Sequence, residues 1–471
     1  MAIWVVAARK SGATMAAARC LTRRNMVNGG GSCSAFPKSH SPNALAGKKE
    51  KENSSALLGF WRFKSTKASA AAAVDQLYSS DEDVTNNHQG LDFPGGHVSY
   101  THSLNFISNS STQNRVPCYR VLDDNGVLIP AAGGGSNAGD FQFHHHQQPL
   151  ISQQTALKMY REMVRLQVMD TIFYEAQRQG RLSFYLTSTG EEAISVAAAA
   201  ALTPDDVVMP QYREPGVLLW RGFSLREFAD QCFGNKDDYG KGRQMPIHYG
   251  SNKLNYFTVS SPLATQIPQA AGVAYALKME KKDACVVTFF GDGSSSEGDF
   301  HAGLNFAAVT ESPVLFVCRN NGIRVDGNDA LAVYNSIRAA REIAVKQGKP
   351  VLVEFLTYRV GHHSTSDDST KYRPVDEIEY WKAMRNPVNR FRKWVEGNGW
   401  WNEGEESELR SATRKQLLQA IQAAERTEKP SLDEMFRDVY DETPSNLREQ
   451  HEQLREMIKR HPGDYPSDVP V

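Results

Sequence analysis

The feature that most constrains the fold is a stretch of roughly 30 residues in which two apolar runs flank a helical pattern. The first run, residues 286–290, has the length and β-rich composition of a buried strand and ends in Gly291-Asp292-Gly293. A helical pattern follows at 297–310, and the second run, 314–318, ends in Arg319-Asn320-Asn321. A strand, a helix and a strand over this length predict a βαβ unit in a parallel sheet.

Both strands end in polar motifs that a parallel sheet brings together. Ligands bind at the carboxyl ends of such strands, so we expect Asp292 and an Asn to meet beside a helix N-terminus. A carboxylate with amide and backbone oxygens suits Mg²⁺, and a helix N-terminus with Arg319 suits phosphate. Gly-Asp-Gly alone is typical of a turn. With Asn-Asn after 26 further residues, it resembles the thiamine diphosphate motif, which implies the diphosphate half of a thiamine-diphosphate-binding α/β fold.

Length, charge and cysteine spacing exclude several classes of protein. A chain of 471 residues allows roughly two to four domains. The formal net charge of −1 gives no reason to expect nucleic-acid binding. The 6 cysteines are widely spaced, without a Cys-x-x-Cys pair, which favours reduced thiols over a disulfide framework or a zinc site. No apolar run approaches the ~18 residues of a membrane span.

Residues 1–65 have the composition of an organelle transit peptide. No acidic residue precedes Glu50, and the arginines lie among Ala, Ser and Met. A disordered basic tail is the alternative, whereas a secretory signal is disfavoured because residues 1–8 have no basic region before the apolar stretch. We therefore expect 1–65 to lie outside the fold. Composition alone does not separate mitochondrial from plastid peptides.

Residues 66–150 are expected to form an N-terminal arm and a low-complexity linker. Within them, 118–122 and 127–129 flank Asn125-Gly126 and predict a hairpin. The run His144-His145-His146 favours a solvated insert over a metal site, because adjacent side chains point in different directions.

An α/β domain is expected over residues 151–373. Apolar residues recur at helical spacing from Leu157 to Ile172, and Gly180 ends that helix. Ser188 through Glu191 match a capping box for an Ala-rich helix at 191–202.

Three loops of this domain carry candidate site residues. Strand-like residues 206–209 lead to Gln211-Tyr212-Arg213-Glu214, where an Arg can pair with phosphate, although a surface ion pair is the simpler explanation. Strand-like residues 257–259 lead to the loop 260–266 and a helix to about Met279. The oxygens of this loop suit a monovalent cation or simple helix capping. The strand 350–358 leads to residues 359–368, whose His pair suggests acid/base chemistry rather than a metal.

Residues 374–471 are expected to be helical. Asn386-Pro387 begins one helix and Gly397 closes it. A stripe of apolar residues indicates a second packing helix: Leu409, Leu417, Leu418 and Ile421.

These motifs together resemble the α subunit of the branched-chain 2-oxoacid dehydrogenase decarboxylase component, over about residues 90–470. The resemblance is carried by residues 211–214, 240–249, 260–266, the Gly-Asp-Gly/Asn-Asn pair and His362-His363-Ser364-Thr365-Ser366-Asp367-Asp368. The last block and Pro246-Ile247-His248-Tyr249 favour the branched-chain enzyme over its pyruvate relative. The resemblance implies 3-methyl-2-oxobutanoate dehydrogenase activity in the mitochondrial matrix, with decarboxylation of a branched 2-oxoacid and transfer of the acyl group to lipoamide.

The resemblance also implies roles for individual residues. The residues that it implies contact thiamine diphosphate are Tyr212, Arg213, Ser261, Leu263, Gly293, Ser294, Arg319 and His363. The metal ligands are Asp292 and Asn321 for Mg²⁺, and Ser260, Pro262, Thr265 and Gln266 for K⁺. His363 would assist acyl transfer, with Arg359 near the diphosphate. Ser364 would be the site where a regulatory kinase adds phosphate and disorders the loop.

One chain supplies only half of such an enzyme. Thiamine diphosphate enzymes also need a pyrimidine-binding domain with an activating Glu, and residues 374–471 contain no second strand–helix alternation. The resemblance implies a β subunit in an α2β2 heterotetramer, docked on a lipoyl-bearing acyltransferase core.

The chain departs from the family after Asn-Asn-Gly. In the family this motif continues into Tyr-Ala-Ile-Ser-Thr and a longer segment, whose Tyr carbonyl completes the Mg²⁺ site, whereas here it runs directly into residues 323–329. Parallel strands need a crossover of about a dozen residues. A five-residue strand is ~16 Å long, and about five stretched residues reach only ~17 Å. The segment from Ile323 must therefore strain, shift or leave the sheet.

This departure leaves alternatives open. The chain is either a shortened form of an active enzyme or a cofactor-impaired, non-catalytic regulatory isoform. Among enzymes, the alternative is a pyruvate- or acetoin-type decarboxylase α subunit.

Overall fold

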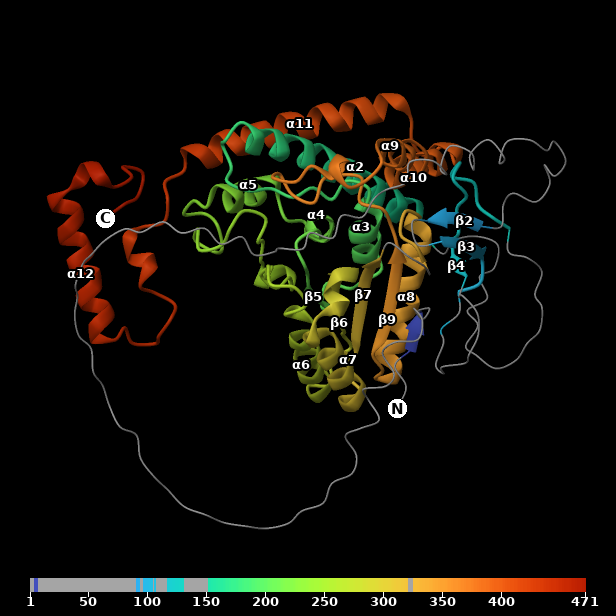
Figure 1. The fold of residues 1–471 in the computed structure, drawn as a ribbon, viewed down its shortest axis with the longest axis horizontal. Coiled ribbons are helices and arrows are strands. Elements are labelled where there is room, and N and C mark those ends of the chain that lie inside the picture. Colours follow the sequence, from blue (N-terminus) through green and yellow to red (C-terminus); the bar gives the residue numbers. More distant parts are fainter. Residues whose placement is uncertain are drawn as a thin grey trace, which may run out of the picture. The chain divides into compact units, whose positions relative to one another are not determined.

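A sheet of nine strands forms the centre of the part of the chain that the structure describes, in the order β2-β3-β4-β8-β9-β7-β6-β5 with β1 beside β9 (Figure 1). The strands are β1 (Trp4–Val6), β2 (Gly90–Phe93), β3 (Gly96–Thr101), β4 (Cys118–Tyr119), β5 (Val207–Met209), β6 (Val286–Gly291), β7 (Val314–Asn320), β8 (Val325–Asp326) and β9 (Val351–Leu356). Only β2 and β3 pair antiparallel. The parallel centre confirms the expected α/β class.

The computed structural model describes residues 4–6, 90–93, 96–104, 106, 117–130, 151–320 and 325–471. The expectations for the His run at 144–146, for most of the transit segment and for Asn321 lie outside these residues. Among the described helices, none has the length and apolar character needed to cross a membrane.

Alternate residues of the central strands face two different cores, as the period of two requires. On β6, Val287 and Phe289 pack into a core with α2, α3 and α8, while Val286 and Phe290 pack with α6 and α7. Because both faces are covered, these strands read as continuous apolar runs. The helices are α2 (Gln153–Arg178), α3 (Glu192–Ala200), α4 (Pro215–Arg221), α5 (Leu225–Phe233), α6 (Gln266–Met279), α7 (Gly298–Thr310) and α8 (Ala330–Gln347).

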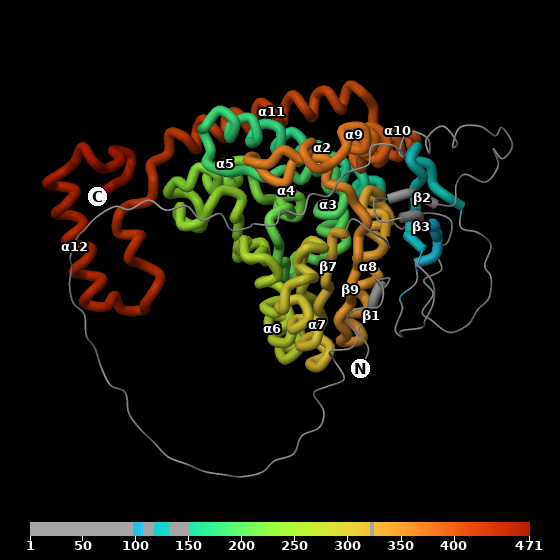
Figure 2. Tube along the Cα trace, in the orientation of Figure 1, coloured from blue at the N-terminus to red at the C-terminus, as the bar shows by residue number. Residues whose placement is uncertain are grey.

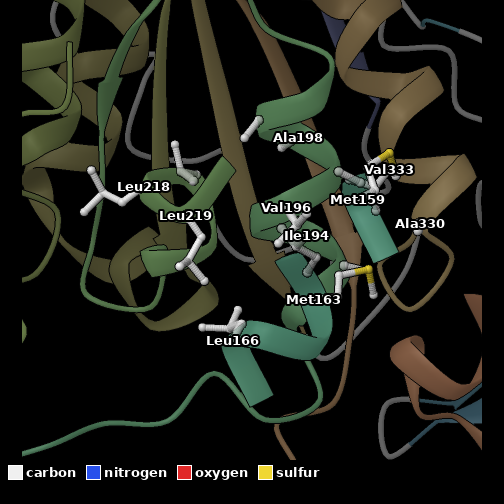
Figure 3. Packing of buried hydrophobic residues seen from close by; sticks show 14 of the residues in the cluster. Met159, Met163, Leu166, Ile194, Val196, Ala198, Leu218, Leu219, Ala330 and Val333 are labelled. Atoms are coloured by element: carbon white, nitrogen blue, oxygen red, sulfur yellow. The ribbon is translucent and has the colours of Figure 1, made fainter. Parts of the chain in front are cut away.

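The Ala-rich helix α3 lies within the larger core. Figure 3 shows side chains of α2, α3, α4 and α8 packing together, among them Met163, Ile194, Leu219 and Val333. The helices approach closely at Gly216, where an added Cβ would lie 2.2 Å from the Ser195 hydroxyl. This close packing fixes the start of α4, which carries one of the site loops.

The chain ends in helices, as expected: α9 (Val375–Met384), α10 (Pro387–Gly397), α11 (Glu403–Arg426) and α12 (Ser445–Arg460). The first three have buried faces, as packing helices should, whereas α12 has no buried residue. The Asn386 side chain caps α10, and α11 lies along α2 and α5 (Figure 2). Leu417 and Ile421 are fully buried, but Leu418 is exposed, so its place in the apolar stripe was wrong.

The segment after the short connection joins the sheet over two residues only. β8 pairs in parallel with β9, Val325 opposite Phe355, and β7 ends opposite Leu356 on the other side of β9. The last residue of β7 and both residues of β8 therefore lie at the carboxyl end of β9, and the chain need not run back along a full strand. Of the three expected outcomes (strain, a shift or departure from the sheet), departure does not occur at residues 325–326, which pair with β9.

Because β8 is short, it leaves the amino-terminal half of β9 unpaired on this side, and β1 pairs there with Val351–Val353. Unpaired strand edges readily accept another strand. Residues 4–6 thus pair with the sheet, contrary to the expectation that all of 1–65 lies outside the fold.

Two local expectations were wrong and one was confirmed. Ser188 does not cap α3, because its hydroxyl donates to the Arg213 carbonyl at 3.4 Å, and Glu191 occupies the N-cap position. Residues 257–259 are not a strand, since only Tyr256 makes isolated bridges there. The hairpin around Gly126 is confirmed by the antiparallel bridge between Leu122 and Leu128.

Candidate functional site

The strands β6 and β7 bring their polar motifs to one edge of the sheet. They pair in parallel with Gly291 opposite Arg319, so Asp292, the first residue after β6, and Asn320, the last residue of β7, occupy neighbouring positions. Asp292 is exposed at the start of the 3₁₀ turn Asp292–Ser296. The register thus brings the ends of both motifs to one edge, where the Asn320 side chain donates to the Glu354 carboxylate of β9. The position of Asn321 lies outside the described residues.

Arg319 is held in a buried cluster of acceptors. Its Nη2 lies 2.8 Å from the Glu214 carboxylate and donates to the Gln211 amide oxygen at 2.8 Å. Its Nη1 lies 3.7 Å from Glu191. Burial lowers the pKa of Arg319, but these two carboxylates outweigh it and hold the pKa above its usual value. Arg319 is therefore a fixed cation at the end of β7.

Arg213 reaches the same edge from the loop after β5. It is buried and donates to two main-chain carbonyls, Thr187 at 2.5 Å and His363 at 2.7 Å. Its guanidinium carbon lies 5.5 Å from the centre of the Tyr212 ring. Burial lowers its pKa. The surface ion pair considered for this Arg is thus wrong, because its partners are interior carbonyls.

Several buried polar atoms at this edge make no hydrogen bond within the described chain, among them Ser294 Oγ, Arg319 Nε and the Glu214 Oε1 that forms the ion pair with Arg319. Such atoms are costly unless something pairs with them. An added Cβ on the exposed Gly293 would meet nothing within 4 Å, so the backbone beside Ser294 is open. Spare N–H and O–H groups beside two arginines fit a diphosphate.

The loop after β9 lies against Arg213. His363 is exposed. Its backbone N–H donates to the Asp367 carboxylate at 2.7 Å, and the same carboxylate also accepts from the Tyr372 hydroxyl at 2.6 Å. Ser364 is half-buried and shares a hydrogen bond with Ser366. Burial and then the charges of Arg213 and Arg359 lower the pKa of His363. The side chain expected for acyl transfer is therefore biased toward the neutral imidazole.

The loop 260–266 runs beside β6. The Gln266 amide nitrogen donates to the Phe289 carbonyl at 2.8 Å, and its amide oxygen is buried without a partner in the described chain. Thr265 sits at the N-cap of α6 but makes no capping hydrogen bond. Simple helix capping is thus not what the loop does. Of its other residues, Ala264 is fully buried and Ser260 is half-buried, whereas Ser261, Pro262 and Leu263 are exposed.

Several residues of this site were not identified from the sequence. Glu191 and Glu214 hold Arg319, and His248 contacts the Ser261 hydroxyl through Nε2. Glu214 and His248 lie in motifs that were recognised, but only contact across the fold shows their roles. No cluster of three or more His, Cys, Asp or Glu side chains suited to a metal occurs within the described ranges.

Comparison with known proteins identifies the family. The dehydrogenase E1 component family matches residues 160–323 and 321–433, two pieces that meet at the short connection. The mitochondrial 2-oxoisovalerate dehydrogenase subunit alpha 1 of Arabidopsis thaliana is 62% identical over 435 residues, covering 87% of this chain and 88% of the relative. The mitochondrial 2-oxoisovalerate dehydrogenase subunit alpha of Mus musculus is 44% identical over 403 residues, covering 80% and 88%. The chain therefore belongs to the dehydrogenase E1 component family, among its 2-oxoisovalerate alpha subunits.

Proposed function

We propose that this E1 α subunit holds thiamine diphosphate at the carboxyl ends of β6 and β7 and decarboxylates branched 2-oxoacids. Both relatives described above are named 2-oxoisovalerate dehydrogenase subunits and mitochondrial, and the acid-free start of this chain agrees with that compartment, the mitochondrial matrix. The observation that carries the proposal is the pair of buried arginines, Arg213 and Arg319, beside the unpartnered Ser294 hydroxyl. When bound, the cofactor supplies the electron sink for loss of CO2, after which the acyl group passes to a lipoyl group.

In this proposal the chain's own residues bind and orient the diphosphate. Arg213, Arg319 and Tyr212 hold its oxygens, and Gly293 and Ser294 lie against it. Ser261 and Leu263 contact the cofactor from the neighbouring loop. Exposed His363, biased toward the neutral form, assists acyl transfer, and Arg359 adds positive charge beside it.

Two metal ions complete the proposed site. Mg²⁺ takes Asp292 and Asn321, because a hard cation prefers carboxylate, amide and phosphate oxygens. The exposed Asp292 is free to turn toward such an ion. K⁺ takes oxygens of Ser260, Pro262, Thr265 and Gln266, and the unpartnered amide oxygen of Gln266 supports that assignment.

The chain works with partners. The pyrimidine-binding half comes from a β subunit in an α2β2 heterotetramer, which delivers acyl groups to an acyltransferase core. Large apolar side chains are exposed on the neighbouring helices α6 and α7, which supports a subunit contact there: Tyr275, Met279, Phe306 and Val309. Contiguous exposed apolar surface is typical of protein interfaces.

Ser364 is the proposed site of a regulatory kinase. A phosphate would place about −2 charges next to His363 and the cofactor phosphates. The loop depends on the single Asp367 carboxylate for two of its bonds, so repulsion between that carboxylate and the phosphate would release it.

The short connection after Asn321 bears on how tightly the proposed site binds its metal and cofactor. The family matches in two pieces that meet at residues 321–323, which supports the absence of a family segment there. Because that segment would supply a Mg²⁺ ligand, we expect weaker Mg²⁺ and thiamine diphosphate binding than in a full-length relative.

Titration of thiamine diphosphate and Mg²⁺ into the co-expressed α2β2 complex, with turnover of 3-methyl-2-oxobutanoate, tests the proposal. We expect saturable turnover by the complex and none by the isolated α chain. Decarboxylation by the pure α chain would contradict the proposal that the β subunit supplies half of the active site. Assembly with β but no cofactor binding would indicate the non-catalytic regulatory isoform. Preference for a two-carbon acyl donor would indicate the pyruvate or acetoin type.

A further inference from the structure

We propose that Glu214 is a positioning residue that sets the separation of Arg213 and Arg319 before the cofactor binds. The inference rests on the proposed function, in which both arginines bind one diphosphate. It assigns no direct contact with the cofactor to Glu214. Its carboxylate instead joins two segments that lie far apart in the chain, the loop after β5 and the end of β7.

The two carboxylate oxygens of Glu214 have different partners. One oxygen, Oε2, accepts the backbone N–H of Gln211 at 2.8 Å and that of Arg213 at 3.3 Å. The other, Oε1, lies 2.8 Å from Arg319 Nη2. One rigid planar group therefore fixes the loop that carries Arg213 to the guanidinium of Arg319.

Glu214 itself has little freedom to move. It is 1% exposed and sits at the N-cap of α4, directly before Pro215. The close contact of Gly216 with Ser195 holds the start of α4 against α3. Helix packing thus fixes the position of the carboxylate, and the carboxylate in turn fixes the positions of the two arginines.

The ion pair with Glu214 also orients the guanidinium of Arg319. Nη2 is occupied by Glu214 and Gln211, whereas Nε is buried without a partner in the described chain. Nε therefore remains as a donor for an incoming phosphate oxygen. Without the carboxylate, Arg319 would be a buried cation whose nearest remaining countercharge is Glu191 at 3.7 Å. A buried charge without a close partner is strongly disfavoured, so Arg319 would turn or shift.

The test compares wild-type and E214Q α2β2 by calorimetry with inorganic diphosphate, and with thiamine diphosphate plus Mg²⁺. The amide oxygen of Gln can still accept the loop N–H groups, but its NH₂ cannot pair with a guanidinium. Residues that orient the ligands of a site typically change its affinity about 10- to 100-fold when altered. We expect a loss of that size for both ligands, with kcat at saturating cofactor retained within about twofold.

E406Q is the matched control, because Glu406 is also a buried, ion-paired carboxylate, 2.6 Å from Arg410 and bonded to the Tyr160 hydroxyl. It should lower the thermal midpoint without changing either affinity. A double-mutant cycle separates positioning from general stability: in an R319M background, E214Q should cost no further affinity. Additive losses would overturn the inference.

Wild-type affinity in E214Q would also overturn it. Should E214Q not assemble, E214D keeps the charge but withdraws it by one methylene, so an intermediate loss is expected and unchanged affinity contradicts the proposal. Failure of the wild-type complex to bind either ligand would instead overturn the proposed function and, with it, this inference.

Discussion

The guanidinium of Arg213 donates to the main-chain carbonyl of His363 at 2.7 Å, which ties an arginine of the proposed diphosphate site directly to the loop after β9. The same guanidinium donates to Thr187, so its planar fork spans two backbone segments. In the proposed site, one side chain therefore couples cofactor binding to the order of this loop.

R213K should loosen the loop as well as weaken cofactor binding. Lysine keeps the charge but is a point donor, so it cannot hold both carbonyls in the fixed geometry of a fork. We expect faster amide hydrogen exchange at residues 361–368 in the apo α2β2 complex, measured by mass spectrometry. Unchanged exchange there would contradict the coupling.

S364E should largely abolish turnover in the α2β2 complex. The added carboxylate would lie in the loop that the Asp367 carboxylate holds, and like charges at short range repel. S411E is the control, because Ser411 is exposed on α11 and lies outside this loop. Decarboxylation of 3-methyl-2-oxobutanoate should fall much further in S364E than in S411E. Near-full activity of S364E would count against the regulatory role.

R359Q should move the acid limb of the pH–rate profile to higher pH. Burial and the charges of Arg213 and Arg359 lower the pKa of His363, so the neutral imidazole persists to lower pH. Removing one of these charges raises the pKa, and the neutral imidazole that the proposed role requires is then lost at a higher pH on acidification. Profiles of kcat/KM for R359Q and for R181Q, which loses a surface arginine paired with Glu425, test this. A shift of equal size in both variants would contradict it.

The fully buried Glu192 should make the folded chain less stable as pH rises from about 4.5 to 8. Burial raises the pKa of Glu192 to about 8. The folded state then binds more protons than the unfolded state over this range, so raising the pH favours unfolding. Glu192 accepts from Gly190 and Gln167, and a Gln side chain can still accept a hydrogen bond. In E192Q the drop of the thermal midpoint between pH 5 and pH 8 should be smaller than in wild type. An equal drop would show that Glu192 does not titrate in this range.

Much of the fold and part of the site follow from local patterns in the sequence. The βαβ unit at 286–320 was predictable because its strands are short apolar runs and their polar ends must meet at one edge of a parallel sheet. The partners of Arg319 were not predictable. Glu191 and Glu214 precede it by more than a hundred residues, and nothing local distinguishes them from surface acids.

The errors have the same origin. Ser188 matched a capping box in sequence, but its hydroxyl turns to the Arg213 carbonyl, a partner that only tertiary packing supplies. Leu418 has the residue type of the buried stripe but lies on the outer side of α11.

The buried side chain of Arg390 holds the segment that follows the short connection. Arg390 is 1% exposed, contacts Asp326 at 2.7 Å and Asp329 at 3.6 Å, and donates to the carbonyls of Leu122 and Asp123. It thus ties β8 and the start of α8 to α10 and to the hairpin. These contacts hold β8 in place although only two of its residues pair with β9.

R390M should therefore destabilise the chain by about 3–5 kcal/mol, because it leaves two buried carboxylates without their counterion. The double variant D326N/R390M should recover part of that loss, since one of the orphaned charges is gone. Thermal or urea unfolding of the α2β2 complex measures both. A double variant as unstable as the sum of its single changes would mean that Arg390 and Asp326 do not act as a pair, and β8 would then be held by its two backbone pairs and Asp329 alone.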